Sequence, residues 1–160
     1  MIPFAKPSSP DSPKKPIANG KTKVLYVEDE DFNWEIAENQ LSKEYNMVRA
    51  RNAEQAFSLL RTQEFALILM DIQLQDSQLD GLEIASIIKG TAQRRVPIFA
   101  QGVNLPDIPI VVVTAHSGLY NNDYLNKVGI AGLIAKPVSF TSLSLMMARL
   151  VAKSVIRVEK

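Results

Sequence analysis

The sequence predicts an α/β protein with a doubly wound, five-stranded parallel sheet. Short apolar runs alternate five times with segments of helical spacing. The strand-like runs are apolar throughout, which is typical of strands covered by helices on both faces of a sheet. Polar residues directly follow several of these runs, as expected where the carboxyl ends of parallel strands form a functional edge.

Each strand and helix can be located from its pattern. The first apolar run, 23–27, ends in the acidic cluster Glu28, Asp29 and Glu30, and helical spacing continues to about residue 44. The other expected strands are 46–50, 65–70, 110–113 and 131–135, and the other expected helices are 53–62, 82–89, a segment beyond 117 and one from about 139. Strands that alternate with helices in this way are joined by right-handed crossovers, so all five should be parallel.

The composition favours one domain and excludes several functional classes. A chain of 160 residues with 46% hydrophobic content can form one ordinary core but not two. The net charge of +1 gives no field that would gather nucleic acid, and no stretch has the roughly 18 apolar residues of a membrane helix. Cysteine is absent, which excludes disulfides and thiolate zinc sites and fits a cytoplasmic protein.

Both termini are expected to lie outside the folded domain. Residues 1–21 combine prolines with serines and lysines, so they should form a flexible tail or, alternatively, a docking segment. We place the domain at 22–155 and a short C-terminal extension at 156–160.

Five polar side chains follow four of the expected strands. Glu28 and Asp29 follow the first strand, and Asp71, Thr114 and Lys136 follow the third, fourth and fifth. Three carboxylates at one edge repel one another unless a cation joins them, and Mg²⁺ suits oxygen ligands. With that cation, Asp71 can act as a nucleophile toward phosphorus, while Lys136 and Thr114 stabilise the oxygens of the transferring group.

Four segments around these residues resemble the signature segments of response-regulator receiver domains, in the same order: VLYVEDE, LILMDIQL, IVVVTAH and GLIAKP. The resemblance covers residues 23 to about 153 and implies the flavodoxin-like (βα)5 receiver fold. It implies that Asp71 is the phospho-acceptor and that Mg²⁺ is bound by Glu28, Asp29, Asp71 and the backbone carbonyl of Gln73. It also implies that Thr114 is the switch hydroxyl and Lys136 the phosphate-binding lysine. The peptide before Pro137 would be cis. The donor would be a histidine kinase or a histidine phosphotransfer protein, and the downstream partner an unknown protein.

Two loops depart from the family pattern. Residues 72–79 lack the usual proline, and this loop is two residues longer than usual. Farther along, 96–100 and 108–113 both resemble the fourth strand, and we choose the second because Thr114 then lies the family's usual 22 positions before Lys136. This choice leaves about 91–107 as an insertion. The insertion is either an extended loop that packs Val96, Ile98 and Phe99 onto its own surface or an element for partner binding or dimerisation.

The resemblance also gives roles to three other positions. Gln73 and His116 match residues that flank the phosphoryl group and tune its hydrolysis, although His116 could equally be an exposed loop residue without a role. The switch position three residues before Lys136 is aromatic in the family but is Leu133 here. We therefore expect the switch to depend mainly on Thr114.

The leading hypothesis is a single-domain receiver that catalyses only its own phosphorylation and dephosphorylation and whose output is a protein contact. One alternative is a pseudo-receiver that binds partners without phosphorylation, but the complete set of acidic residues argues against it. Another is a Mg²⁺-dependent phosphohydrolase of the haloacid dehalogenase type. That chemistry needs a second acid two residues after the nucleophile, where this chain has Gln73.

Overall fold

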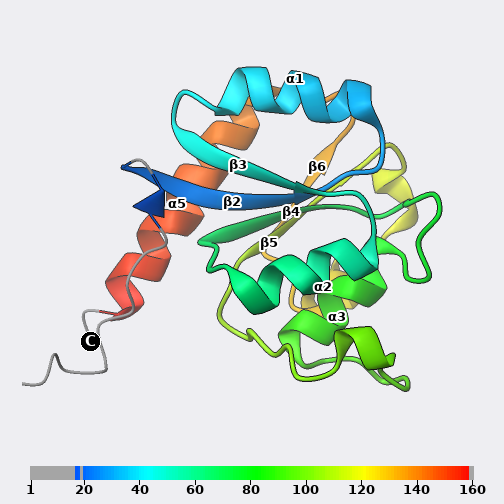
Figure 1. Cartoon of the computed structure of the whole chain (residues 1–160). Coiled ribbons are helices and arrows are strands. Elements are labelled where there is room, and N and C mark those ends of the chain that lie inside the picture. The colour runs from blue at the N-terminus through cyan, green and yellow to red at the C-terminus, as the bar shows by residue number, and fades with distance from the viewer. Residues whose placement is uncertain (1–16, 19, 159–160) are drawn as a thin grey trace, which may run out of the picture.

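A computed structural model of the chain describes residues 17, 18 and 20–158 (Figure 1). Strands and helices alternate along most of its length. The strands are β1 (Ile17–Ala18), β2 (Lys21–Val27), β3 (Tyr45–Ala50), β4 (Leu67–Asp71), β5 (Ile110–Thr114) and β6 (Gly132–Ala135). The helices are α1 (Asp31–Leu41), α2 (Ala53–Thr62), α3 (Gly81–Lys89), α4 (Asn122–Val128) and α5 (Phe140–Val158), with short 3-10 turns η1 (Ile98–Ala100) and η2 (Ser117–Leu119). None of the helices that the structure describes is long and apolar enough to cross a membrane.

Five of the strands form the predicted parallel sheet, in the order β3-β2-β4-β5-β6. The predicted fold class is therefore confirmed. The sixth strand, β1, was not expected: it pairs antiparallel with the beginning of β2, at Thr22 and Lys21. The strand order reverses between β2 and β4, and that reversal is the point at which doubly wound sheets bind ligands.

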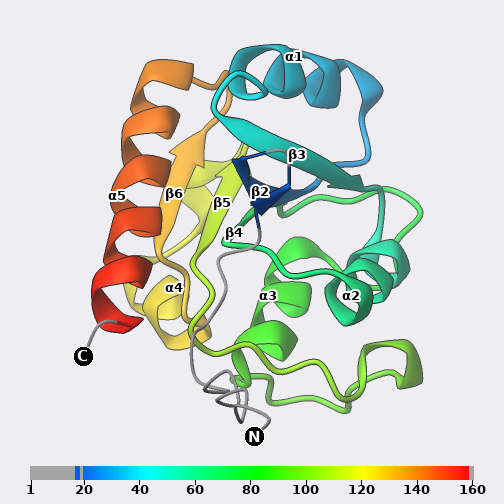
Figure 2. The same cartoon turned by 60° about the vertical axis from the view of Figure 1, so that its left-hand side comes forward.

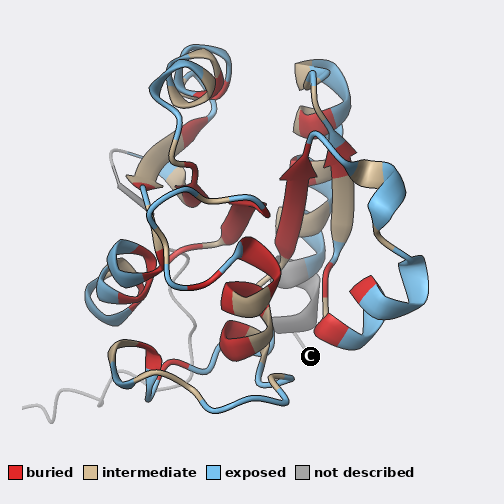
Figure 3. Ribbon diagram, turned by 90° about the vertical axis from the view of Figure 1, so that its right-hand side faces the viewer, coloured by how far each residue is buried: buried red, intermediate tan, exposed pale blue. Residues whose placement is uncertain are grey.

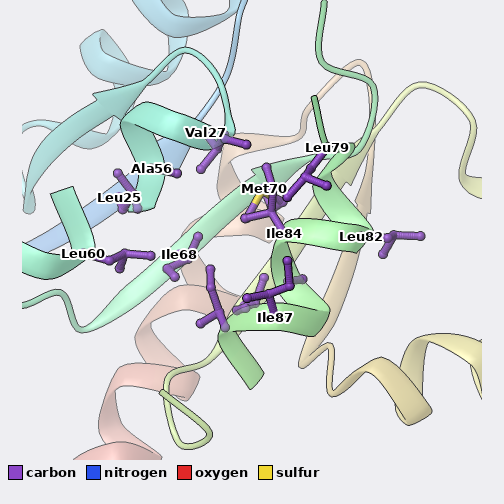
Figure 4. Packing of buried hydrophobic residues seen from close by; sticks show 14 of the residues in the cluster. Leu25, Val27, Ala56, Leu60, Ile68, Met70, Leu79, Leu82, Ile84 and Ile87 are labelled. Atoms are coloured by element: carbon purple, nitrogen blue, oxygen red, sulfur yellow. The ribbon is translucent and has the colours of Figure 1, made fainter. Parts of the chain in front are cut away.

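Helices cover both faces of the sheet (Figure 2). Helices α1 and α5 pack on one face over a cluster that includes Val24, Leu69 and Met147. Helices α2, α3 and α4 cover the other face over a larger cluster, in which Ile68 and Met70 of the central strand contact side chains of α2 and α3 (Figure 4). This double coverage explains why β4 and β5 are buried along their whole length (Figure 3).

The predicted tail and domain boundaries need correction. Residues 1–16 and 19, which make up most of the predicted tail, lie outside the described residues. Ile17 and Ala18, however, belong to β1, and Lys21 already belongs to β2, so the sheet begins before residue 22. At the other end, α5 continues to Val158 and includes the first part of the segment expected to be an extension.

The insertion at 91–107 packs onto the domain rather than onto itself, so the self-packing alternative was wrong. Phe99 contacts Phe57 of α2, with ring centroids 6.0 Å apart, and Nη2 of Arg61 donates a hydrogen bond to the carbonyl of Gln101 at 2.8 Å. Ala100 and Val103 are buried in the larger core cluster. Ile98, which was expected to be packed, is 86% exposed. The chosen fourth strand is confirmed, because β5 is Ile110–Thr114 and the rival segment forms η1.

Candidate functional site

The predicted polar residues lie together at one edge of the sheet. Residues Val27 and Met70 are paired in register, as are Asp71 and Val113, and Thr114 and Ala135. The ends of β2, β4, β5 and β6 are therefore level with one another. The residues that end or follow these strands are Glu28, Asp29, Asp71, Thr114 and Lys136.

Three carboxylates form the centre of this edge. Glu28, Asp29 and Asp71 each offer an oxygen atom that lies within 4.8 Å of the other two. Glu28 and Asp71 are buried, whereas Asp29 is half-buried. Oxygen atoms at this spacing are suited to a hard divalent cation that retains some water ligands.

Lys136 supplies a positive charge beside two of the carboxylates. Its Nζ donates a hydrogen bond to Oδ2 of Asp71 at 3.1 Å and lies 3.5 Å from Oε2 of Glu28. Burial alone lowers the pKa of the Lys136 ammonium, but the charges of Asp71 and Glu28 outweigh burial, so its pKa lies above the ordinary value. Lys136 therefore stays protonated at neutral pH. The peptide between Lys136 and Pro137 is cis, as predicted.

One ammonium does not compensate three carboxylates. Burial is the main cause that raises the pKa of the Glu28 carboxyl to about 7, and the neighbouring negative charge of Asp71 raises it further. Oε2 of Glu28 is fully buried and has no hydrogen-bond partner among the described residues. A buried carboxylate oxygen in this state is costly unless a cation approaches it. The donor set therefore fits Mg²⁺, with Glu28, Asp29 and Asp71 as the carboxylates that would hold it.

Backbone donors orient the other two carboxylates. The backbone N–H of Gln73 donates to Oδ1 of Asp71 at 3.2 Å, and that of Gln75 donates to Oδ2 of Asp29 at 2.8 Å. The loop 72–79, which differs from the family pattern, thus contacts two of the three acids. Because Oδ1 and Oδ2 of Asp71 have different partners, its carboxylate is held in one orientation.

The predicted switch and tuning residues lie around this centre at different depths. Thr114 is buried, and its Oγ1 accepts a hydrogen bond from the backbone N–H of His116 at 3.1 Å. The side chains of His116 and Gln73 are exposed at the rim. Leu133 lies farther from the carboxylates: it is partly buried against the larger core cluster and lines a groove beside Leu125 of α4.

Three residues that position this site were not identified from the sequence. Nδ2 of Asn33 donates to Oε1 of Glu28 at 2.7 Å, and Nε of Arg49 donates to the backbone carbonyl of Glu28 at 2.9 Å. Gly81, at the start of α3, lies so close to the backbone of Asp71 that an added Cβ would be 2.0 Å from the Asp71 carbonyl oxygen. The Asp80-Gly81 pair did mark the start of a helix in the sequence, but nothing in the pattern indicated this close contact.

Comparison with known proteins identifies the family. A family model described as the response regulator receiver domain matches residues 24–148. The chain belongs to this family. DivK of Brucella anthropi, a polar-differentiation response regulator, is 30% identical over 117 residues, which are 72% of this chain and 85% of DivK. An NtrX-like response regulator of Rickettsia conorii is 29% identical over 127 residues, which are 79% of this chain and 24% of that protein. The receiver domain thus spans about a quarter of the length of its NtrX-like relative.

Solved structures agree with this assignment. The crystal structure of the receiver domain of NtrX from Brucella abortus has a TM-score of 0.67 and 25% identity, and the match covers 81% of this chain and 98% of that one. The receiver domain of sensor histidine kinase PA1611 from Pseudomonas aeruginosa shares the fold, with a TM-score of 0.64 and 23% identity over 82% of this chain and 98% of that one. That structure has a magnesium ion coordinated in its active site cleft. The protein is therefore a receiver domain of two-component signalling, as the resemblance implied.

Proposed function

We propose that this receiver domain accepts a phosphoryl group on Asp71 in a Mg²⁺-dependent reaction and thereby alters a protein-binding surface. The observation that carries the proposal is the position of the Asp71 carboxylate. It lies beside both of the other acids and the ammonium of Lys136, with an oxygen within 4.8 Å of oxygens of the acids and Oδ2 3.1 Å from Nζ. A histidine kinase or a histidine phosphotransfer protein is the expected donor, because the family belongs to two-component signalling.

The chemistry assigns a different task to each side chain. A carboxylate oxygen of Asp71 attacks phosphorus, so that an O–P bond forms while the P–N bond of a phosphohistidine donor breaks and the imidazole leaves. Lys136 neutralises the oxygens of the transferring group, and the hydroxyl of Thr114 can turn from its contact with His116 to donate to one of them. Mg²⁺ held by Glu28, Asp29, Asp71 and the carbonyl of Gln73 would supply the remaining positive charge.

The alternative functions have less support. The phosphohydrolase hypothesis needs an acid at position 73, and the Gln73 side chain there is neutral and exposed. Membership of the receiver family also weighs against it. A pseudo-receiver that is never phosphorylated would have no need for a buried acid whose pKa is raised and whose Oε2 has no hydrogen-bond partner in the described part of the chain.

The signal should leave the site through Thr114 and the loop that follows it. A phosphoryl group adds roughly two negative charges, which attract the Thr114 hydroxyl and the Lys136 ammonium. Leu133 has no aromatic ring to bury, so we expect only a small response there and a larger one in η2 and at the start of α4. Amide NMR shifts with and without beryllofluoride test this route. Large changes confined to β6 and α5, with the loop after Thr114 unmoved, would contradict it.

Labelling by a small donor tests the proposed function directly. Incubation with acetyl phosphate and Mg²⁺ should add one phosphoryl group by intact mass, and chelation of Mg²⁺ should prevent it. Asp71→Asn should abolish the label. Asp76→Asn is a matched control, because Asp76 is an exposed residue of the same loop with a φ of 53°, a conformation that asparagine tolerates. Absence of label on the unmodified protein would favour the pseudo-receiver, and persistent label on the Asp71→Asn variant would refute the assignment of the acceptor.

A further inference from the structure

The side chain of Glu28 is oriented by a residue that has no assigned part in the chemistry. The backbone of Glu28 is fixed on both sides: its N–H donates to the carbonyl of Ala50 at 2.9 Å, and its carbonyl accepts from Nε of Arg49 at 2.9 Å. Arg49 in turn pairs with Asp31 and lies over the ring of Trp34. The main chain of Glu28 therefore cannot shift easily, and only its side-chain torsions remain to be set.

Asn33 sets those torsions. Its Nδ2 donates to Oε1 of Glu28 at 2.7 Å and to Oε2 of Glu30 at 2.9 Å. The two N–H bonds of one amide thus point at two carboxylates. An amide rotated by 180° would instead turn its carbonyl oxygen toward both negative groups, so the observed orientation is strongly favoured.

The two oxygen atoms of Glu28 consequently have different surroundings. Oε1 is occupied by Asn33, whereas Oε2 is buried, has no hydrogen-bond partner among the described residues and lies on the side of Lys136. Oε2 is thus hydrogen-bonded to no described group and has only the Lys136 ammonium 3.5 Å away, so it can also take part in binding a cation. Hydrogen bonds to metal-binding side chains commonly tune metal affinity in this way.

We propose that Asn33 is a positioning residue for Mg²⁺ binding, which holds Oε1 of Glu28 so that Oε2 is presented to the cation site. This inference rests on the proposed function, because it assumes that Mg²⁺ binds at Glu28, Asp29 and Asp71. Asn33 itself does not touch the cation or the phosphoryl group. Its neutral amide has the further advantage that it orients Glu28 without adding a positive charge that would compete with the cation.

Mg²⁺ titration by calorimetry, without any phosphoryl donor, tests the inference. Asn33→Leu retains the approximate volume and favours the helix but removes both donors, and it should weaken Mg²⁺ binding by about tenfold. Asn33→Ala should weaken Mg²⁺ binding to a similar extent, and this variant is the second test if Asn33→Leu folds poorly. Asn39→Ala is the matched control, because Asn39 is an exposed asparagine on the same helix, and its affinity should stay within about twofold of the unmodified protein.

Acetyl phosphate labelling at a series of Mg²⁺ concentrations separates positioning from a general structural role. The Asn33 variants should need about tenfold more Mg²⁺ for half-maximal labelling but should reach a maximal rate within about twofold of the unmodified protein. An unchanged Mg²⁺ affinity, or a reduced maximal rate at unchanged affinity, would overturn the inference, and so would an equal loss in the Asn39→Ala protein. Failure of the proposed function would look different: the unmodified protein itself would bind no Mg²⁺ or take no label.

Discussion

The carboxylate edge and the 91–107 insertion obey different physical rules. At the edge, charged groups are buried with incomplete compensation, as Oε2 of Glu28 shows, and this arrangement costs stability. The insertion contributes apolar packing: Ala100 and Val103 join the core, and Phe99 covers Phe57. The carboxylate edge therefore lowers the stability of the fold, whereas the insertion raises it.

The two regions also differ in how the chain holds them. Each acid at the edge ends or follows a buried strand, so its position is fixed by the register of the sheet. The insertion is attached through contacts with helices, such as the bond from the Leu105 N–H to the carbonyl of Ile88 and the contact of Thr91 Oγ1 with the carbonyl of Val128. We therefore expect substitutions at the edge to change phosphorylation, and substitutions in the insertion to change stability alone.

Gly81→Ala should have the largest effect, because it affects the edge and the core together. The new Cβ would lie 2.0 Å from the carbonyl oxygen of Asp71, and backbone at both positions would have to move. We expect a loss of about 2 to 3 kcal/mol in the free energy of unfolding. Labelling by acetyl phosphate should slow by about tenfold or more, because the nucleophile is displaced.

Urea denaturation and the labelling rate measure these two effects separately. Gly118→Ala is the matched control, because an added Cβ at Gly118 meets nothing within 4 Å and that residue lies in η2, which follows the end of β5. Normal labelling of a folded Gly81→Ala protein would show that the site tolerates displacement of α3 and that the edge is less rigid than the register suggests.

Phe99→Ala tests whether the insertion affects stability alone. It removes a partly buried ring that packs against Phe57, and we expect a loss of about 2 kcal/mol in the free energy of unfolding. The labelling rate at saturating Mg²⁺ should remain within about twofold of the unmodified protein. A folded Phe99→Ala protein that takes no label would mean that the insertion shapes the site, and the separation of the two regions would fail.

The pH dependence of stability without Mg²⁺ tests the cost of the edge. Burial raises the pKa of Glu28 from 4.5 to about 7 in the folded protein, so its contribution to stability is full below pH 4.5 and is lost as the pH rises to about 7. Burial also raises the pKa of Asp80, so the ionisation of Asp80 likewise lowers stability as the pH rises. Two other groups with shifted pKa values titrate outside this pH range. The pKa of Lys136 is raised above its ordinary value of 10.5, and hydrogen bonds from Arg49 and Arg51 lower the pKa of Asp31 below its ordinary value of 3.8.

In a chelating buffer, the protein should therefore be less stable at about pH 7.5 than at about pH 5, by on the order of 1 kcal/mol. Urea midpoints at the two pH values measure the difference. Glu28→Gln should reduce the slope, because the amide does not titrate. An equally steep profile in that variant would place the titrating group elsewhere.

The sequence predicted the edge better than the insertion for a physical reason. Strand ends in a parallel sheet converge whatever the loops do, so acids that follow apolar runs can be placed without knowing any side-chain contact. The support given to Glu28 by Asn33 and Arg49 depends on helix orientation and side-chain torsions, which no spacing rule specifies. The packing of Phe99 on Phe57 depends likewise on how a long connection folds back. The pairing of β1 was missed because a two-residue strand next to prolines has too few positions to show a pattern.

Ile98→Ser should have the smallest effect on the isolated domain. It tests whether the insertion is an element for dimerisation. Ile98 is 86% exposed, so the free energy of unfolding should change by no more than about 0.5 kcal/mol, and the labelling rate should not change. If the insertion only stabilises the fold, sedimentation velocity at high protein concentration should give the same species for the variant and the unmodified protein. A larger species that the serine substitution disperses would instead assign dimerisation to the insertion. Leu145→Ser is the matched control, because Leu145 is 64% exposed on α5, so loss of the larger species in both variants would indicate nonspecific hydrophobic association.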